Sequence, residues 1–176
     1  MFATPEALAH FVKPWAKFHN HSKVAATLAT FLHIAPIVVG GGFGIFLDRA
    51  TLRVKHDDPH ASERHLLELR AVHPYVISAL ALSFVSGIAL LAADLDTFLG
   101  SIVFWIKMGL VLLLLANGVF MQRLEHALGR VAEGTVNGAS VLRAATLWDR
   151  LRLVAIVSLL LWLTITFTGV ALVNVS

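Results

Sequence analysis

Cysteine is absent from this chain of 176 residues, so the protein has no disulfide, no thiolate metal ligand and no cysteine nucleophile. Motifs that mark many soluble enzymes are missing as well: the sequence contains no Walker loop, no H-E-x-x-H and no G-x-S-x-G. The glycine cluster GGGFG lies inside an apolar run, whereas phosphate binding needs a glycine-rich turn between a strand and a helix. ATP-driven transport and hydrolase chemistry therefore lack their usual sequence evidence.

Charged residues are scarce in this sequence and apolar residues are abundant, at 14% and 57% of the chain. This composition is typical of an integral membrane protein and not of a soluble domain. The formal net charge is +3, but the basic residues lie next to apolar segments, where they set membrane topology. We therefore expect the lipid bilayer, and no nucleic acid, as a partner.

Four segments are long and apolar enough to cross a bilayer, which takes roughly 20 residues. They are predicted at about 24–47, 72–93, 102–121 and 153–173. The predicted fold is an all-α integral membrane protein, with a bundle of four transmembrane helices over residues 24–173. In the preceding segment, 1–23, Leu8, Phe11 and Trp15 recur at helical spacing, so we expect an N-terminal interfacial helix on the membrane surface.

The basic residues are distributed unevenly between the predicted loops. The loop after the first span carries Arg49, Arg53, Lys55, Arg64 and Arg70, and the loop after the third span carries Arg123, Arg130, Arg143, Arg150 and Arg152. The short link DLDTFLGS between the second and third spans carries none. By the positive-inside rule, both basic loops face the cytoplasm and both termini face outside. We expect the protein in a bacterial inner membrane.

Two ionisable residues stand out within the predicted spans: His33 in the first and Lys107 in the third. Ionisable groups inside a membrane are costly and mark functional sites by default. His33 precedes Arg49 by 16 positions, and Lys107 precedes Arg123 by 16 positions. Because both spans run in the same direction and a helix rises about 1.5 Å per residue, both groups should lie about 24 Å from the inner interface. We expect the imidazole and the amine at the same depth, where they could approach one object from two sides.

The composition of the first span is consistent with a haem site. A histidine inside a helical bundle is a candidate axial ligand of haem iron, and Gly40, Gly41 and Gly44 could leave room for the macrocycle. The alternative is that His33 only hydrogen-bonds a neighbouring helix, that Gly40 and Gly44 form a packing motif, and that Lys107 snorkels outward. From the residues alone, both interpretations stay open.

The motifs LHIAPIVVGGGFGIFLDR and FWIKMGLVLLLLANGVFMQRL resemble the first and third spans of the HemJ-type membrane protoporphyrinogen oxidases and of the broader CopD-like group of small membrane proteins. The intervening segment, from ALSFVSG onward, fits the same pattern. The resemblance implies a four-helix bundle that binds haem b, with His33 and Lys107 associated with haem binding and activity. Arg49 and Arg123, which end the two motifs, are counted with them as candidate cofactor-binding residues.

Other histidines give weaker hypotheses. His73 and His126 lie near the predicted inner face, where they could hold a second haem, although an N-cap position before Pro74 also explains His73. The segment KHDDPHASERH, residues 55–65, offers imidazoles and carboxylates that suit zinc or copper(II), but a solvated loop is the favoured interpretation.

We therefore predict a haem b-binding membrane redox protein that transfers electrons to or from a quinone, a porphyrinogen or a partner subunit. His33 would be the axial ligand, and Lys107 the opposite ligand or a charge that tunes the haem. One haem is expected, or two if His73 and His126 hold another. An activity of protoporphyrinogen-oxidase type, a homo-oligomer and a larger redox complex stay open. The rival hypothesis is a non-enzymatic membrane subunit or a copper-handling protein in which His33 is structural.

Overall fold

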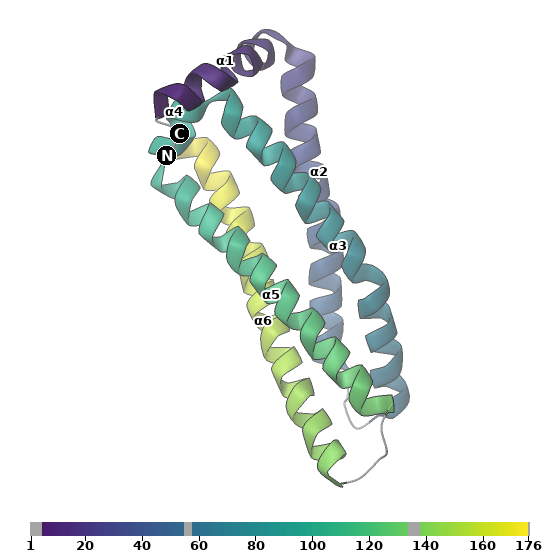
Figure 1. The fold of residues 1–176 in the computed structure, drawn as a ribbon. Coiled ribbons are helices and arrows are strands. Elements are labelled where there is room, and N and C mark those ends of the chain that lie inside the picture. Colours follow the sequence, from purple (N-terminus) through teal and green to yellow (C-terminus); the bar gives the residue numbers. More distant parts are fainter. Residues whose placement is uncertain (1–4, 55–57, 134–137, 176) are drawn as a thin grey trace.

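The structure, a computed structural model, describes residues 5–54, 58–133 and 138–175, and every element in these residues is a helix. The elements in chain order are α1 (Pro5–His21), α2 (Lys23–Arg53), α3 (Pro59–Ala93), α4 (Leu95–Gly100), α5 (Ile102–Glu133) and α6 (Gly138–Val175). The four long helices form an elongated bundle, and α1 lies across one of its ends (Figure 1). The predicted all-α fold with four long apolar helices is confirmed.

The bundle is built from two pairs of neighbouring helices. Helix α2 packs along α3 and helix α5 packs along α6, and the two pairs are joined chiefly through contacts between α2 and α6. Helices α3 and α5 touch only sparsely, so this side of the bundle is the most loosely packed. The end of α2, the start of α3, the end of α5 and the start of α6 all lie at the end of the bundle opposite α1 (Figure 1). We call this the basic end, because it carries both arginine-rich segments.

The helices long and apolar enough to cross a membrane are Lys23–Arg53, His60–Ala93, Ile102–Ala132 and Gly138–Leu172. Each contains one of the predicted spans, and each extends beyond it at the basic end. Arginine, glutamate and alanine are good helix formers, so a helix continues past the point where the apolar run stops. Hydropathy marks only the apolar part of each helix, which explains why the helices are longer than the predicted spans.

The outer faces of the long helices are strongly apolar. Phe31 on α2, Leu113 on α5 and Phe167 on α6 each expose more than half of their surface. Monomeric soluble proteins rarely expose continuous apolar faces of this kind. The apolar helices and their apolar outer faces indicate contact with a lipid bilayer.

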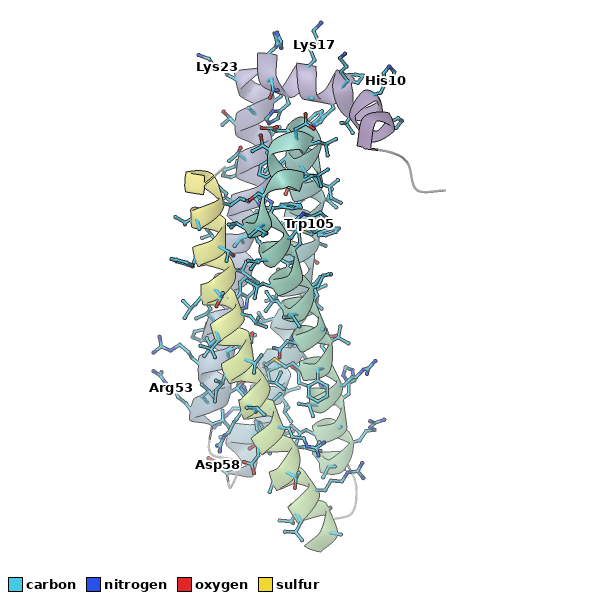
Figure 2. The ribbon with its side chains drawn as sticks, turned by 90° about the vertical axis from the view of Figure 1, so that its left-hand side faces the viewer. His10, Lys17, Lys23, Arg53, Asp58 and Trp105 are labelled. Carbon is cyan, nitrogen blue, oxygen red and sulfur yellow. The ribbon has the colours of Figure 1, made fainter. Side chains whose placement is uncertain are left out.

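The bend between α1 and α2 is defined by Ser22. This residue has an extended backbone and its side chain accepts a hydrogen bond from the Ala25 N–H at 3.2 Å, as an N-cap does. Helix α1 is also tied to α3, because the indole Nε1–H of Trp15 donates to the carbonyl oxygen of Ala89 at 2.7 Å. Figure 2 shows α1 lying across this end of the bundle, with Lys17 and Lys23 directed away from it. These contacts hold the predicted N-terminal helix against the bundle.

Candidate functional site

His33 lies on α2, in the half of the bundle nearer to α1, and is half-buried. Its Nδ1–H donates a hydrogen bond to the backbone carbonyl oxygen of Ser83 on α3, at 2.9 Å. Every hydrogen-bond contact of this ring within the described residues is made by Nδ1, so Nε2 keeps its lone pair for another partner. Metal-ligating histidines have this arrangement, in which one ring nitrogen donates to a carbonyl and the other faces the metal.

Small residues of α3 shape the surroundings of the His33 ring. The hydroxyl groups of Ser83 and Ser86 donate to the carbonyl oxygens of His33 and Leu32, both at 3.1 Å. A Cβ built on Gly87 would lie 3.0 Å from the Cε1 atom of His33, so only glycine leaves the ring undisturbed there. Sequence reasoning gave these residues no role, although small residues clustered within one apolar span are a known signal of close helix packing.

Lys107 lies on α5 and is also half-buried. It is close enough to His33 to interact with it electrostatically. The Lys107 amine also lies near α6, because a Cβ built on Gly169 of that helix would lie 3.6 Å from the amine nitrogen. The imidazole of α2 thus lies against a small residue of α3, Gly87, and the amine of α5 lies against a small residue of α6, Gly169. We call this set of residues the His33–Lys107 site.

The glycines of α2 pack against neighbouring helices. A Cβ on Gly40 would lie 2.6 Å from the Cβ of Ala79 on α3, so α2 and α3 approach each other closely at this point. The indole of Trp162, from α6, covers Gly41 and Gly44, with ring atoms 3.1 Å and 2.9 Å from the positions that a Cβ would take. The space beside these glycines is filled by protein, as in the packing interpretation, so room for a macrocycle must come from elsewhere in the bundle.

The other candidate residues lie away from the His33–Lys107 site. Arg49 and Arg123 are exposed at the basic end. His126 is exposed on α5, and its Nδ1–H donates to the carbonyl oxygen of Gln122 in the same helix at 2.7 Å. His73 is buried and faces a different side chain, Glu125. The structure thus shows no direct contact between His73 and His126.

A second group of polar side chains gathers inside the basic half of the bundle, with one residue from each long helix. The Nδ1 atom of His73 lies 3.0 Å from a carboxylate oxygen of Glu125, without the alignment of a hydrogen bond. Asp48 is 3% exposed, interacts with Ser158 and His73, and has one carboxylate oxygen without a hydrogen-bond partner. We call Asp48, His73, Glu125 and Ser158 the buried polar cluster. Sequence reasoning missed it, because Asp48 and Glu125 fall just beyond the apolar runs.

The segment 55–65, considered above for zinc or copper, is described only from Asp58 onward; residues 55–57 lie outside the described residues. Asp58 is the N-cap of α3, where its side chain accepts from the Ala61 N–H at 3.1 Å. His65 is buried, and its Nε2 lies 2.8 Å from the hydroxyl of Thr51 on α2. Across the part of the chain that the structure describes, no three histidine or acidic side chains are arranged to hold a metal ion.

Two places in the bundle therefore gather polar groups from several helices. The His33–Lys107 site was predicted because both residues interrupt apolar runs, whereas the buried polar cluster emerged only from the structure. The chemistry that the His33–Lys107 site and the buried polar cluster can carry out is inferred from how their side chains are arranged. Comparison with protein-family models, with curated proteins and with solved structures finds no match for this chain.

Proposed function

We propose that this chain is an integral membrane haem b protein that carries electrons, with His33 as an axial ligand and Lys107 beside it. The observation that supports this most directly is the hydrogen bond from the His33 Nδ1–H to the Ser83 carbonyl oxygen at 2.9 Å. It fixes the tautomer in which Nε2 has a free lone pair, and it fixes the plane of the ring. The second nitrogen is thereby available as a metal ligand.

The surrounding residues fit this role. Ser83 orients the imidazole, and Gly87 leaves room for it on α3. Lys107 places an amine on the other side of the same space: as a neutral amine it could coordinate iron, and as an ammonium it would favour the reduced form of a neighbouring redox group. Haem b would supply a one-electron couple here. Helices α3 and α5 make few contacts with each other, so we propose that the planar group enters on this side of the bundle.

The proposal includes a place in the membrane. The four apolar helices would cross a bacterial inner membrane, with the basic end in the cytoplasm and α1 on the outer surface. The His33–Lys107 site would then lie in the outer half of the bilayer. Electrons would be exchanged with a quinone, a porphyrinogen or a partner subunit, each of which can reach a site at this depth through the membrane or from the outer surface.

The test is a visible spectrum of the protein purified in detergent, recorded as reduced minus oxidised. We expect sharp haem b bands from the unaltered chain, their loss in His33→Ala, and shifted or weakened bands in Lys107→Ala. His21→Ala and Lys17→Ala, which alter exposed residues of α1, are matched controls that should keep the spectrum unchanged. A chain that stays colourless after haem is supplied would contradict the proposal.

Two further variants separate ligation from folding. His33→Gly should lose the bands and recover them when free imidazole is added, which a merely structural histidine would not do. Gly87→Leu should displace the His33 ring and weaken the bands, whereas Gly109→Leu, where an added Cβ would meet no atom within 4 Å, should leave them intact. Equal effects of the two glycine variants would contradict the geometry proposed for the site.

The rival function keeps the same fold. In a non-enzymatic membrane subunit or a copper-handling protein, the bond between His33 and Ser83 would serve only to join α2 to α3. That protein would be colourless with haem present, and His33→Ala would alter its stability without altering any spectrum.

A further inference from the structure

A groove of about 650 Å³ lies between α2 and α3 at the basic end of the bundle. Its α2 side is formed by residues three or four positions apart between 42 and 53, which lie on one face of a helix. Its α3 side is formed by the first turns of that helix, from Ala61 to Glu68. The groove is separate from the His33–Lys107 site, which lies in the opposite half of the bundle.

Three arginines line the charged end of this groove. Arg49 and Arg53 lie one turn apart on α2, and Arg64 faces them from α3; Arg53 projects outward from the bundle (Figure 2). None of the three forms an ion pair with an acidic side chain in the described part of the chain. The acid of the groove, Glu68, lies instead 3.7 Å from Nδ1 of His65. The guanidinium groups thus keep their forked donors free, and this geometry matches a phosphate group.

The opposite end of the groove is apolar. Ile45 and Phe46 line it, and a Cβ added at Gly42 would meet no atom within 4 Å. Arg53 lies eleven positions after Gly42, so the groove extends about 16 Å along α2, from the charged end toward the middle of the apolar helix. The groove is therefore amphipathic along its length, with the charged end where a lipid headgroup would lie and the apolar end where an acyl chain would lie.

We propose that this groove binds one anionic phospholipid, with its phosphate held by Arg49, Arg53 and Arg64 and an acyl chain lying over Ile45 and Phe46. Basic pockets between transmembrane helices at the cytoplasmic side are a common form of lipid headgroup site. The groove has three arginines without ion-pair partners among the described residues at one end and apolar side chains at the other. This favours a lipid over a soluble phosphate ester, which would make no favourable contact with the apolar end. This inference depends on membrane insertion and is independent of haem.

The test measures lipid binding by native mass spectrometry of the whole chain in detergent, titrated with phosphatidylglycerol or with phosphatidylcholine of the same acyl chains. We expect phosphatidylglycerol to bind more tightly than phosphatidylcholine. Because each basic contact strengthens anionic lipid binding by several-fold, the combined variant R49Q/R53Q/R64Q should weaken phosphatidylglycerol binding by roughly a hundredfold. Its binding of phosphatidylcholine should not change. Equal affinity of the unaltered chain for the two lipids would overturn the proposal.

The matched control removes three arginines of the same end that lie outside the groove. R130Q/R143Q/R150Q alters three exposed positions on α5 and α6, and it should bind phosphatidylglycerol as the unaltered chain does. A loss as large as that of the groove variant would mean that total charge, and not the groove, determines binding.

Two more measurements complete the test. If R49Q/R53Q/R64Q does not fold, R49K/R53K/R64K replaces it, because this variant keeps the charge but loses the forked geometry. It should bind phosphatidylglycerol more weakly than the unaltered chain, and unchanged binding would overturn the role of the arginine geometry.

Glycerol phosphate, which has no acyl chain, should not displace the lipid. Displacement at similar concentrations would identify a soluble phosphate ester as the ligand. The haem spectrum should be unchanged in R53Q/R64Q, which alters no residue considered for the haem site, so failure here is distinguishable from failure of the proposed function.

Discussion

The contact between His73 and Glu125 allows a quantitative test of the buried polar cluster. The two side chains lie on α3 and α5, which otherwise touch sparsely, and they expose 9% and 1% of their surface. The Nδ1 atom of His73 and a carboxylate oxygen of Glu125 are 3.0 Å apart. We predict that removing either partner destabilises the bundle strongly, and that removing both costs much less than the sum of the two changes.

The magnitude follows from the distance and the burial. As an imidazolium and a carboxylate 3.0 Å apart, the pair attracts by about 5.5 kcal/mol at an effective dielectric constant of about 20. Desolvating each ion costs several kcal/mol, so the intact pair adds little compared with two apolar side chains. A single substitution leaves the other charge buried without its partner, and this costs about 3–5 kcal/mol.

The cluster also predicts an asymmetry between the two single variants. Asp48 interacts with His73 as well, so Glu125→Leu leaves the histidine facing one remaining carboxylate. His73→Leu instead leaves two acids, Asp48 and Glu125, without the imidazole with which both interact. We therefore expect His73→Leu to cost more than Glu125→Leu.

The assay is equilibrium unfolding in mixed micelles of sodium dodecyl sulfate and dodecyl maltoside, followed by tryptophan fluorescence. Four chains give a double-mutant cycle: the unaltered protein, His73→Leu, Glu125→Leu and the double variant. We expect a coupling free energy of about 1–3 kcal/mol. Glu68→Leu, at an acid that is 62% exposed, is the control and should change stability by no more than about 0.5 kcal/mol.

The result that would refute this reasoning is additivity. If the two single variants each cost less than about 1 kcal/mol and their costs add in the double variant, the contact does not act as a buried ion pair. The cluster would then be accessible to water, and its four polar residues would be independent of one another.

Two further predictions concern how the helices are held together. Gly40→Ala places a Cβ 2.6 Å from the Cβ of Ala79, so we expect a loss of about 1–3 kcal/mol in the same unfolding assay. Gly42→Ala, with no atom within 4 Å, should be neutral or gain up to about 1 kcal/mol, and equal losses in both variants would be inconsistent with the packing. Trp15→Phe removes the 2.7 Å bond to the Ala89 carbonyl, so amide hydrogen exchange should become faster in α1 alone, with a cost of about 1 kcal/mol. Faster exchange throughout the bundle would show that α1 supports the whole fold.

The sequence was most informative where a property depends on a single helix. Length and hydropathy located all four apolar helices, and the counts from His33 to Arg49 and from Lys107 to Arg123 predict that both polar groups lie at one depth. Hydropathy, however, ends the predicted segments before the helices themselves end at the basic end. Asp48 and Glu125 were therefore assigned to loops, although they lie within helices whose charged residues support helix formation.

The glycines show a different limit. A run with Gly40, Gly41 and Gly44 indicates close approach to the backbone, but it does not say what approaches. The structure shows that Ala79 and the Trp162 indole fill this space. Trp162 lies more than a hundred positions away in the chain, on a helix whose rotation about its axis decides whether its ring faces α2 or the outside.

The amino-acid sequence by itself determined the number of apolar helices and their order, and it predicts one depth for His33 and Lys107, because apolar length and helical rise are local properties. The tertiary structure alone decided which residues share a site. The approach of Ser83 and Gly87 to His33, the pairing of His73 with Glu125 and the convergence of Arg49, Arg53 and Arg64 on one groove all depend on how each helix is rotated and tilted against its neighbours. Rotation and tilt are set by packing between residues distant in sequence, and so no pattern within one helix contains them.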